Sequence, residues 1–255
     1  MMVIYHYTTI SGLIGIISNL ELWASDCRYL NDGTELTYAN NIFLEEVGKL
    51  NREPKDFSQG GGYRIPYSVM HYFRMFVTCF CRNGDLLSQW RGYGVDQGYS
   101  LGFYTSKLRA LNNGEIIRIQ YGISNPSQYF ARELEDATHV TDHPGNYDYF
   151  ASEQFLPRIS RIKHPGFAEE QEWRLMLQLS AGEVNMQNEK IKFRPSKMGP
   201  ISYLALPIKR NCLKEIVIGP GENIKIREEA VQNLLDYYGY EGVKTRNSKI
   251  PFRSI

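Results

Sequence analysis

The stretch from Phe167 to Leu177, FAEEQEWRLML, changes abruptly from acidic to apolar. From Glu172 onward it has the pattern of a strand, and alternation predicts that Glu172, Arg174 and Met176 share one face. A carboxylate at the head of an apolar strand has two interpretations. Glu172 is either half of an ion pair on an exposed edge, which contributes little to stability, or a functional acid whose pKa is tuned by the arginine two residues on.

Runs with strand character recur along the chain and indicate the fold class. Short β-branched or aromatic runs predict strands at residues 3–7, 20–25, 74–81, 99–104, 115–121, 172–179, 190–193, 201–206, 215–218 and 242–245. Helical spacing predicts a short helix that buries Leu13, Ile14, Ile16 and Ile17, a helix that buries apolar residues between 36 and 47, and helical stretches near 84–93, 127–137, 147–163 and 223–238. These strands are too irregularly spaced for βαβ units. We therefore expect one α+β domain over residues 1–255 with mostly antiparallel sheets.

Composition and charge narrow the functional class. The chain has 29 Lys and Arg against 28 Asp and Glu, so no overall field favours a nucleic acid or a membrane, although a local basic patch remains open. There is no apolar run long enough for a transmembrane helix, and the N-terminus lacks the features of a signal peptide. The four cysteines form no CxxC pair, so we expect neither a disulfide framework nor a structural zinc site. A reducing cytoplasm is the expected setting.

The motif YHYT, Tyr5 to Thr8, ends the first predicted strand. Alternation places His6 and Thr8 on one face, where an imidazole and a hydroxyl could recognise a ribose or an amide. The alternative interpretation is a histidine whose hydrogen bonds are satisfied at a strand end.

The segment SDCRYLNDGTE, residues 25–35, joins a predicted strand to a predicted helix and carries Arg28 and Asn31. Loops at strand ends commonly hold functional sites. The alternative is turn and capping chemistry, in which Asn31 and Asp32 make the turn and Thr34 caps the helix. The carboxylates here do not have the spacing of a calcium loop, and we predict no metal site.

Aromatic and glycine residues gather in LLSQWRGYGVDQGYSLGF, residues 86–103. Trp90 and Tyr93 are three residues apart, so on a helical turn they would share a face and could sandwich a planar ring. The neighbouring glycines would let the backbone approach a ligand closely. The alternative is a packed aromatic pair beside a glycine-rich turn.

Six blocks in order resemble a widespread bacterial family of unknown function over residues 4–220: YHYT, LW.S with LND..E, a CF strand, W..Y with GF, E.EWRL and IVIGP. In its first strand and its acid-led strand, that family is in turn similar to the ADP-ribosyltransferase superfamily. The similarity is to the branch with a first-strand histidine and a late glutamate, which includes the poly(ADP-ribose) polymerases and the DNA-modifying toxins of toxin–antitoxin pairs. This resemblance implies split, mostly antiparallel sheets flanked by helices.

The resemblance also implies residue roles around an NAD molecule. His6 matches the histidine that binds a ribose hydroxyl of NAD in that branch, and Thr8 takes the polar position beside it in the toxins. Glu172 matches the catalytic glutamate at the head of a late strand. Trp90 and Tyr93 are the best-placed aromatics for stacking on nicotinamide, with Trp23 of the second strand as another candidate.

The remaining implied residues are polar. Arg174 and Arg28 are the candidates for the catalytic arginine of the toxins, and Arg28 and Asn31 are expected among the groups that bind NAD. The chemistry needs a carboxylate that stabilises an oxocarbenium-like ribose as the bond to nicotinamide breaks, and it needs no metal.

The implied function is an NAD-dependent ADP-ribosyltransferase, as a toxin or phage-defence effector. Its expected acceptor is a nucleic acid or a protein, and an antitoxin or immunity protein is an expected partner. Three alternatives remain open at this point. They are an NAD glycohydrolase with the same site, a non-catalytic ligand-binding module, and a metal-dependent nuclease built from Asp26, Asp32, Glu35 and Glu172.

Overall fold

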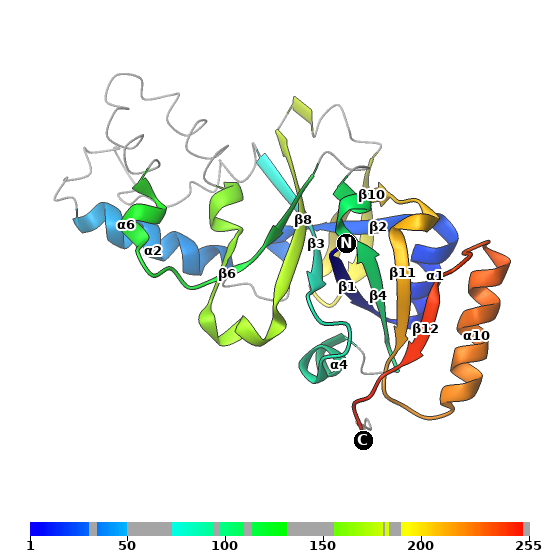
Figure 1. Ribbon diagram of the computed structural model, residues 1–255. Coiled ribbons are helices and arrows are strands. Elements are labelled where there is room, and N and C mark those ends of the chain that lie inside the picture. Colours follow the sequence, from blue (N-terminus) through cyan, green and yellow to red (C-terminus); the bar gives the residue numbers. More distant parts are fainter. Residues whose placement is uncertain are drawn as a thin grey trace.

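The computed structural model describes residues 1–30, 35–49, 73–93, 97–109, 114–131, 156–180, 182–183 and 190–251. Within these ranges one large sheet contains ten strands (Figure 1). They are β1 Val3–Thr8, β2 Glu21–Asp26, β3 Phe73–Cys81, β4 Tyr99–Tyr104, β5 Glu115–Arg118, β8 Glu172–Ser180, β9 Ile191–Ser196, β10 Gly199–Pro207, β11 Leu213–Ile218 and β12 Lys244–Asn247. A small second sheet pairs β6 Gln120–Tyr121 with β7 Ile162–Lys163.

The strand order confirms the predicted α+β class with mostly antiparallel pairing. The main path runs β12-β11-β4-β1-β3-β2-β10-β9, and β8 joins β3 to the edge strand β5. Within the described chain only the pairs β11–β12 and β6–β7 are parallel. Most neighbouring strands in this order are distant in sequence, so the sheet depends on long-range pairing.

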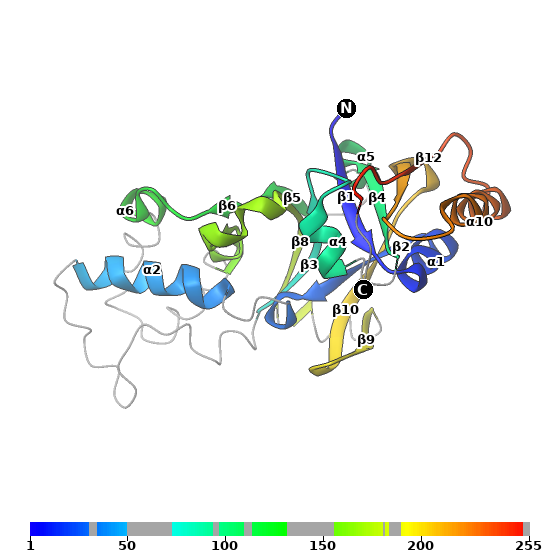
Figure 2. The same cartoon turned by 90° about the horizontal axis from the view of Figure 1, so that it is seen from below.

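Helices cover both faces of the sheet (Figures 1 and 2). The described helices are α1 Ile10–Asn19, α2 Glu35–Lys49, α4 Leu87–Tyr93, α5 Thr105–Arg109, α6 Pro126–Tyr129 and α10 Ile224–Tyr237, with 3-10 turns η1 Cys27–Tyr29, η2 Pro165–Glu170 and η3 Arg210–Cys212. On one face, α1 and α10 pack on the largest apolar cluster. On the other face, Trp90 of α4 packs against Tyr7 and Val217, while α2 lies beside β7 and α6, with the Phe43 ring 5.3 Å from the Phe130 ring.

The main sheet is split where β1 and β2 meet β3. Both strands lie along the same edge of β3, but β2 pairs with it at Phe76 and Val77, whereas β1 pairs with it at Cys81 alone. Residues 78–80 between these points pair on this edge with neither strand. Side chains hold the gap instead, because Thr78 Oγ1 donates to the Trp23 carbonyl at 3.1 Å and His6 Nδ1 donates to the Cys79 carbonyl at 2.9 Å.

One predicted core residue and several element boundaries differ from the prediction. Ile14 is 46% exposed because only Leu13, Ile16 and Ile17 of α1 lie on its inner face. The strand predicted at 115–121 is broken at Ile119, whose N–H donates to the Glu172 carbonyl. The last strand begins two residues late, after a turn at Gly242 with φ +74°.

The two helical stretches predicted in the middle of the chain are described only in part. α6 ends at Tyr129, and in the stretch predicted at 147–163 the described part is a helical turn at 156–159 followed by β7. The other residues of both stretches lie outside the described ranges. No helix in the described parts of the chain has the length and apolar character needed to cross a bilayer.

Candidate active site

A cavity of about 320 Å³ lies at the split between β1 and β2. Consecutive residues of two strands line it, Tyr5 to Tyr7 of β1 and Val77 to Cys81 of β3. Consecutive residues of a strand point to opposite faces of the sheet. They can line one cavity only where the edge of the strand is not paired with a neighbour. The cavity therefore reaches the backbone of β3 through the split. Its size is at the lower end of the range of small-molecule sites.

His6 and Glu172 both line this cavity, although they do not extend from the same face of the sheet. Pairing places Tyr5 opposite Cys81 and Cys81 opposite Glu172, so these three share a face. His6 follows Tyr5 and therefore starts on the other face. It reaches the cavity because its ring fills the split, where Nδ1 bonds to the Cys79 carbonyl.

The hydrogen bond of His6 determines what its ring can offer a ligand. Burial lowers the pKa of His6, and the Cys79 carbonyl only partly opposes this effect. The imidazole is therefore neutral at neutral pH, with the proton on Nδ1 and a lone pair on Nε2. Such a nitrogen accepts a hydrogen bond from a hydroxyl group.

Glu172 and Arg174 form a buried pair, 5% and 2% exposed. Arg174 Nε lies 2.7 Å from Glu172 Oε1, and Arg174 Nη2 lies 3.1 Å from Oε2. Arg174 Nη1 donates to the Ser160 carbonyl at 3.0 Å. The alternation predicted from EWRLML is confirmed, and an ion pair on an exposed edge is the wrong interpretation.

Lys163 is a third member of this cluster that the sequence analysis missed. Its Nζ lies 3.0 Å from Glu172 Oε2 and 2.7 Å from Glu170 Oε2, and it sits 4.8 Å from the centre of the Phe167 ring. With Glu170, the cluster contains two carboxylates and two cations, so its net charge is zero. Lys163 ties η2 to the head of β8, where the Glu172 N–H donates to the Tyr121 hydroxyl at 2.7 Å.

These contacts fix the ionisation state of Glu172. Burial would raise its pKa, but the Arg174 charge and hydrogen bonds, the Lys163 ammonium and a hydrogen bond with the Cys79 side chain outweigh it and lower the pKa to about 2. Glu172 is therefore ionised throughout the neutral range. It cannot donate a proton there and is a poor general base, but it can accept hydrogen bonds and stabilise a positive charge.

Aromatic side chains line the cavity. Tyr93 of α4 and Trp23 of β2 both line it and are 42% and 45% exposed, with Tyr29 and Phe167 also in the wall. Trp23 lies against Tyr203, with ring centres 4.4 Å apart. Exposed rings beside a polar cavity are suited to stacking on a planar ligand.

Trp90 does not line the cavity. It is fully buried, its ring packs edge-on against Tyr7 at 4.7 Å, and its Nε1 donates to Asp85 Oδ1 at 2.8 Å. Asp85 also accepts hydrogen bonds from Ser248 Oγ at 2.5 Å and from the Lys249 N–H at 2.8 Å. Asp85 therefore links Trp90 of α4 to the segment after β12, and these hydrogen bonds hold the helix that carries Tyr93.

Two other predicted ligand-binding residues, Thr8 and Arg28, lie elsewhere. Thr8 lies outside the cavity wall, with its hydroxyl close against Gly12 of α1. Arg28 is also outside it, because its guanidinium binds both oxygens of the buried Asp26 carboxylate. Asn31 lies outside the described residues.

Arg194 of β9 is a second cavity residue that the sequence analysis missed. Its Nη2 donates to Ser25 Oγ at 3.2 Å. The two residues lie on β9 and β2, which are separated by β10, the strand that pairs with both. No local pattern in the sequence links positions 25 and 194. Only the strand order brings this cation to the split.

The nuclease alternative loses two of its four carboxylates to arginines. Asp26 is paired with Arg28 and Glu172 with Arg174. Asp32 and the side chain of Glu35 lie outside the described residues. Among the residues that are described, no group of three or more His, Cys, Asp or Glu side chains is arranged to hold a metal ion.

Residues 89–175 match the model of a family described as a protein of unknown function (DUF2971), which confirms the resemblance predicted for this part of the chain. No curated protein matches the sequence. Among solved structures, the chain is similar to the DarT of Thermus sp. 2.9 in complex with NAD+, at 13% identity and a TM-score of 0.35 over 96% of this chain and 95% of the other. It is similar at 13% identity and a TM-score of 0.34 to the same protein in complex with ADP-ribosylated ssDNA, over 99% of this chain and 94% of the other.

Proposed function

We propose that this chain is an NAD-dependent ADP-ribosyltransferase whose active site is the cavity at the sheet split. One observation carries the proposal: His6, a neutral hydrogen-bond acceptor, and Glu172, a carboxylate ionised at neutral pH, line the same cavity. These are the two residues that the YHYT and E.EWRL blocks assign to the ribose of NAD. The exposed rings of Tyr93 and Trp23 in the same wall would stack on nicotinamide.

The ionisation state of Glu172 suits this reaction better than acid–base chemistry. When the bond between ribose and nicotinamide breaks, its electron pair leaves with nicotinamide, and positive charge develops on the ribose. A fixed carboxylate stabilises that charge without a proton transfer of its own. The leaving group needs no protonation, because its nitrogen is cationic before the bond breaks.

The cluster around Glu172 would hold the carboxylate in one orientation. Arg174 and Lys163 occupy three of its acceptor positions, and the Cys79 thiol also bonds to it. A thiol is a weak donor, so a ribose hydroxyl can replace it. In this proposal Arg174 is a positioning residue and does not contact the substrate.

The cations that line the cavity also fit an anionic substrate. Arg194 lies on the β9 side of the cavity, and its guanidinium donates to the neutral hydroxyl of Ser25. Its guanidinium is therefore the group best placed to bind a phosphate oxygen of NAD. The acceptor, a nucleic acid or a protein, and an antitoxin or immunity partner stay predictions from the resemblance.

The test compares NAD consumption by Glu172→Gln and Glu170→Gln. Both glutamates line the cavity and bind Lys163, so the pair is matched in charge and in location. We expect Glu172→Gln to lower the rate by about 100- to 1,000-fold, with a much smaller effect on NAD affinity because the bound ribose is not yet a cation. Glu170→Gln should retain most of the activity.

The products separate the remaining alternatives. Free ADP-ribose as the sole product identifies a glycohydrolase, whereas label transferred from NAD to a macromolecule identifies a transferase. Equal rates in wild type and Glu172→Gln would contradict the role of Glu172. A wild-type chain that neither binds nor consumes NAD would contradict the proposed function itself.

A further inference from the structure

Gln89 of α4 is a nearly buried polar residue in the wall of the cavity at the sheet split. It is 8% exposed, and it lines the cavity together with Tyr93, which lies four residues later on the same face of the helix. Trp90, next to Gln89 in sequence, points into the core instead. No hydrogen bond joins the Gln89 side chain to any residue that the structure describes. The cavity wall therefore contains an amide without a partner.

An amide in such a place needs hydrogen bonds. The side chain of glutamine has an acceptor, Oε1, and two N–H donors on Nε2. Buried polar groups are nearly always hydrogen-bonded in folded proteins, because a donor or acceptor left unpaired costs free energy. Gln89 lines the cavity, so a ligand there can reach its amide. A ligand group with one donor and one acceptor side by side would satisfy both ends of the amide.

The position of α4 places Gln89 on the Glu172 side of the cavity. Strand pairing puts Tyr5 and Glu172 on one face of the sheet, and Tyr7 extends from the same face. Trp90 packs against Tyr7, with ring centres 4.7 Å apart, so α4 covers this face. α4 also lies beside η2, the turn that leads into Glu172. Gln89 therefore belongs to the end of the cavity where the bond between ribose and nicotinamide would break.

The other end of the cavity carries a cation. Arg194 lies on β9, which β10 and β2 separate from β3. If its guanidinium binds a phosphate oxygen of NAD, the phosphates and the adenosine beyond them extend toward β9. The nicotinamide ring then lies toward α4, beside Tyr93 and Gln89.

We propose that Gln89 binds the carboxamide of nicotinamide and selects NAD over dinucleotides that lack this group. This inference rests on the proposed function and deepens it. A carboxamide pairs head to tail with the amide of a glutamine: its N–H donates to Oε1, and Nε2 donates to its carbonyl oxygen. The two hydrogen bonds would also fix the rotation of the ring on which Tyr93 stacks.

A carboxylate cannot replace the carboxamide in this arrangement. Nicotinic acid adenine dinucleotide differs from NAD only in that a carboxylate stands in place of the carboxamide. It has no N–H for Oε1 of Gln89, and it brings a negatively charged oxygen against that atom. A site built to hydrogen-bond one group rejects an analogue that leaves its polar atoms unpaired. We therefore expect the wild-type chain to bind NAD at least about tenfold more tightly than the acid, as for the loss of one hydrogen bond.

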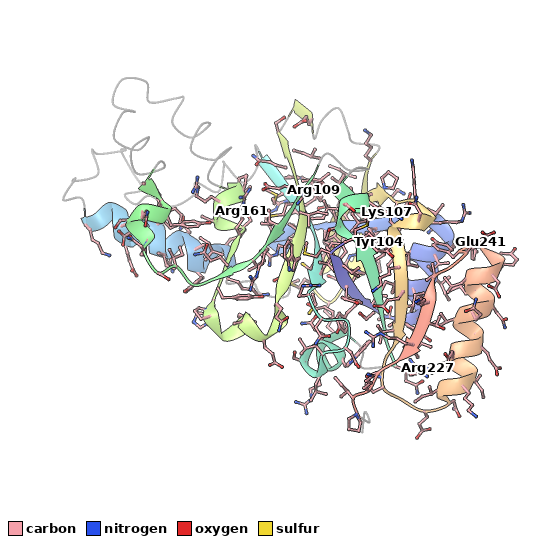
Figure 3. All side chains as sticks on the ribbon, viewed as in Figure 1. Tyr104, Lys107, Arg109, Arg161, Arg227 and Glu241 are labelled. Carbon is pink, nitrogen blue, oxygen red and sulfur yellow. The ribbon has the colours of Figure 1, made fainter. Side chains whose placement is uncertain are left out.

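The test compares Gln89→Met and Gln89→Glu with the control Gln232→Met. Gln232 is exposed on α10, where its Nε2 donates to Asp236 at 2.8 Å. In Figure 3, α10, which carries the labelled Arg227, lies at one end of the molecule, and it packs on the opposite face of the sheet from α4. Quenching of tryptophan fluorescence directly after rapid mixing gives the Kd of each dinucleotide before NAD is consumed. A thermal melt checks that each variant is folded.

The measured quantity is the ratio of the two Kd values. Gln89→Met should bring the ratio closer to one, because it removes hydrogen bonds that NAD makes and the acid does not. Gln89→Glu should widen the ratio, because its carboxylate still accepts from the N–H of NAD but repels the carboxylate of the acid. Gln232→Met should keep the wild-type ratio. Because the two Gln89 variants are expected to move the ratio in opposite directions, either one that folds is sufficient.

The outcomes separate this inference from the proposed function. A purely structural role of Gln89 would weaken the binding of both dinucleotides by the same factor and leave the ratio unchanged. That result, or a wild-type chain that binds NAD and the acid equally well, would overturn the role of Gln89 and leave the proposed function in place. A wild-type chain that binds neither dinucleotide would overturn both.

Discussion

Glu172 and Arg174 show how two adjacent positions on one face of a strand can fix an ionisation state. Both charges are buried, so each needs the other, and Lys163 adds a second cation on Oε2. Removing one partner of such a pair leaves a charge in a poorly solvated place, whereas loss of an exposed pair costs almost nothing.

This contrast predicts the stability of two methionine variants. Arg174→Met should lower the free energy of unfolding by about 3–5 kcal/mol, because Lys163 is then the cation that remains beside Glu172. Lys192→Met breaks the half-exposed pair with Glu21 and should cost less than about 1 kcal/mol. Urea unfolding followed by circular dichroism measures both values. Similar losses in the two variants would show that the Glu172 cluster is not the buried ion pair described above.

The low pKa of Glu172 predicts how stability depends on pH. Its folded pKa of about 2 lies below its ordinary value of 4.5, so the folded state binds this proton less tightly than the unfolded state does. The resulting stabilisation is fully present above about pH 4.5 and is lost as the pH falls toward 2. It amounts to about 3 kcal/mol, at about 1.4 kcal/mol for each tenfold change in proton affinity.

Urea unfolding between pH 6 and pH 2 tests this dependence. The wild-type free energy should fall more steeply with acidity than that of Glu172→Gln, which lacks the titrating group. Glu170→Gln serves as the control and should keep the steep wild-type profile. Parallel profiles for wild type and Glu172→Gln would contradict the lowered pKa.

At the scale of elements, the site depends on how α4 and β11 pack. Gly219 follows β11, its N–H donates to the Gly98 carbonyl, and Trp90 of α4 lies against it. A Cβ at Gly219 would lie 2.6 Å from the Gly98 oxygen and 2.9 Å from the Trp90 ring. The close contact of helix and strand is therefore possible only with glycine at this position.

Two glycine-to-alanine variants test this packing. Gly219→Ala should lower the free energy of unfolding by about 1–3 kcal/mol, because backbone and a buried ring must move. Gly92→Ala lies in α4 with no atom near its new Cβ, and should stabilise the helix by about 0.5–1 kcal/mol. The midpoint of urea unfolding, compared with that of the wild type, shows whether each variant is less or more stable. A neutral Gly219→Ala would mean that α4 does not pack on β11 as described.

Local patterns predicted the elements of the site better than their assembly. Alternation was enough to pair Glu172 with Arg174, because the two residues are neighbours on one strand. Lys163 was missed because the chain reverses through η2 before it meets Glu172, although the His-Pro-Gly sequence at 164–166 is a turn signal. Helical spacing could not tell Trp90 from Tyr93, because the burial of Trp90 depends on Tyr7 and Asp85.

For the whole molecule, the cavity joins parts of the sheet that are distant in sequence. Its wall takes side chains from β1, β2, β3, β8 and β9, with α4 and η2 at its sides. These strands come together through the pairings β1–β3, β2–β3, β3–β8, β2–β10 and β9–β10. Because global unfolding separates all of them, a ligand of this cavity binds only the folded chain.

This organisation predicts that NAD raises the melting temperature of the whole chain. At a free concentration 100 times its Kd, NAD should add about 2.7 kcal/mol to the free energy of unfolding. Trp23→Ala, which removes a ring from the cavity wall, should reduce the shift at the same NAD concentration. Tyr237→Ala removes an exposed ring from α10 and should not. A melting temperature that NAD leaves unchanged would contradict NAD binding.

The order in which the chain is synthesised gives this architecture a further consequence. Residues of the cavity wall run from Tyr5 to Arg194, and the Asp85 anchor of α4 needs Ser248 and Lys249. A nascent chain on the ribosome therefore cannot close the cavity until Arg194 has emerged, and cannot fasten α4 until after β12. Prematurely terminated fragments lack the assembled site. If NAD is the substrate, the chain can act on the cell's NAD pool only late in translation, after all the strands of the cavity wall have been synthesised.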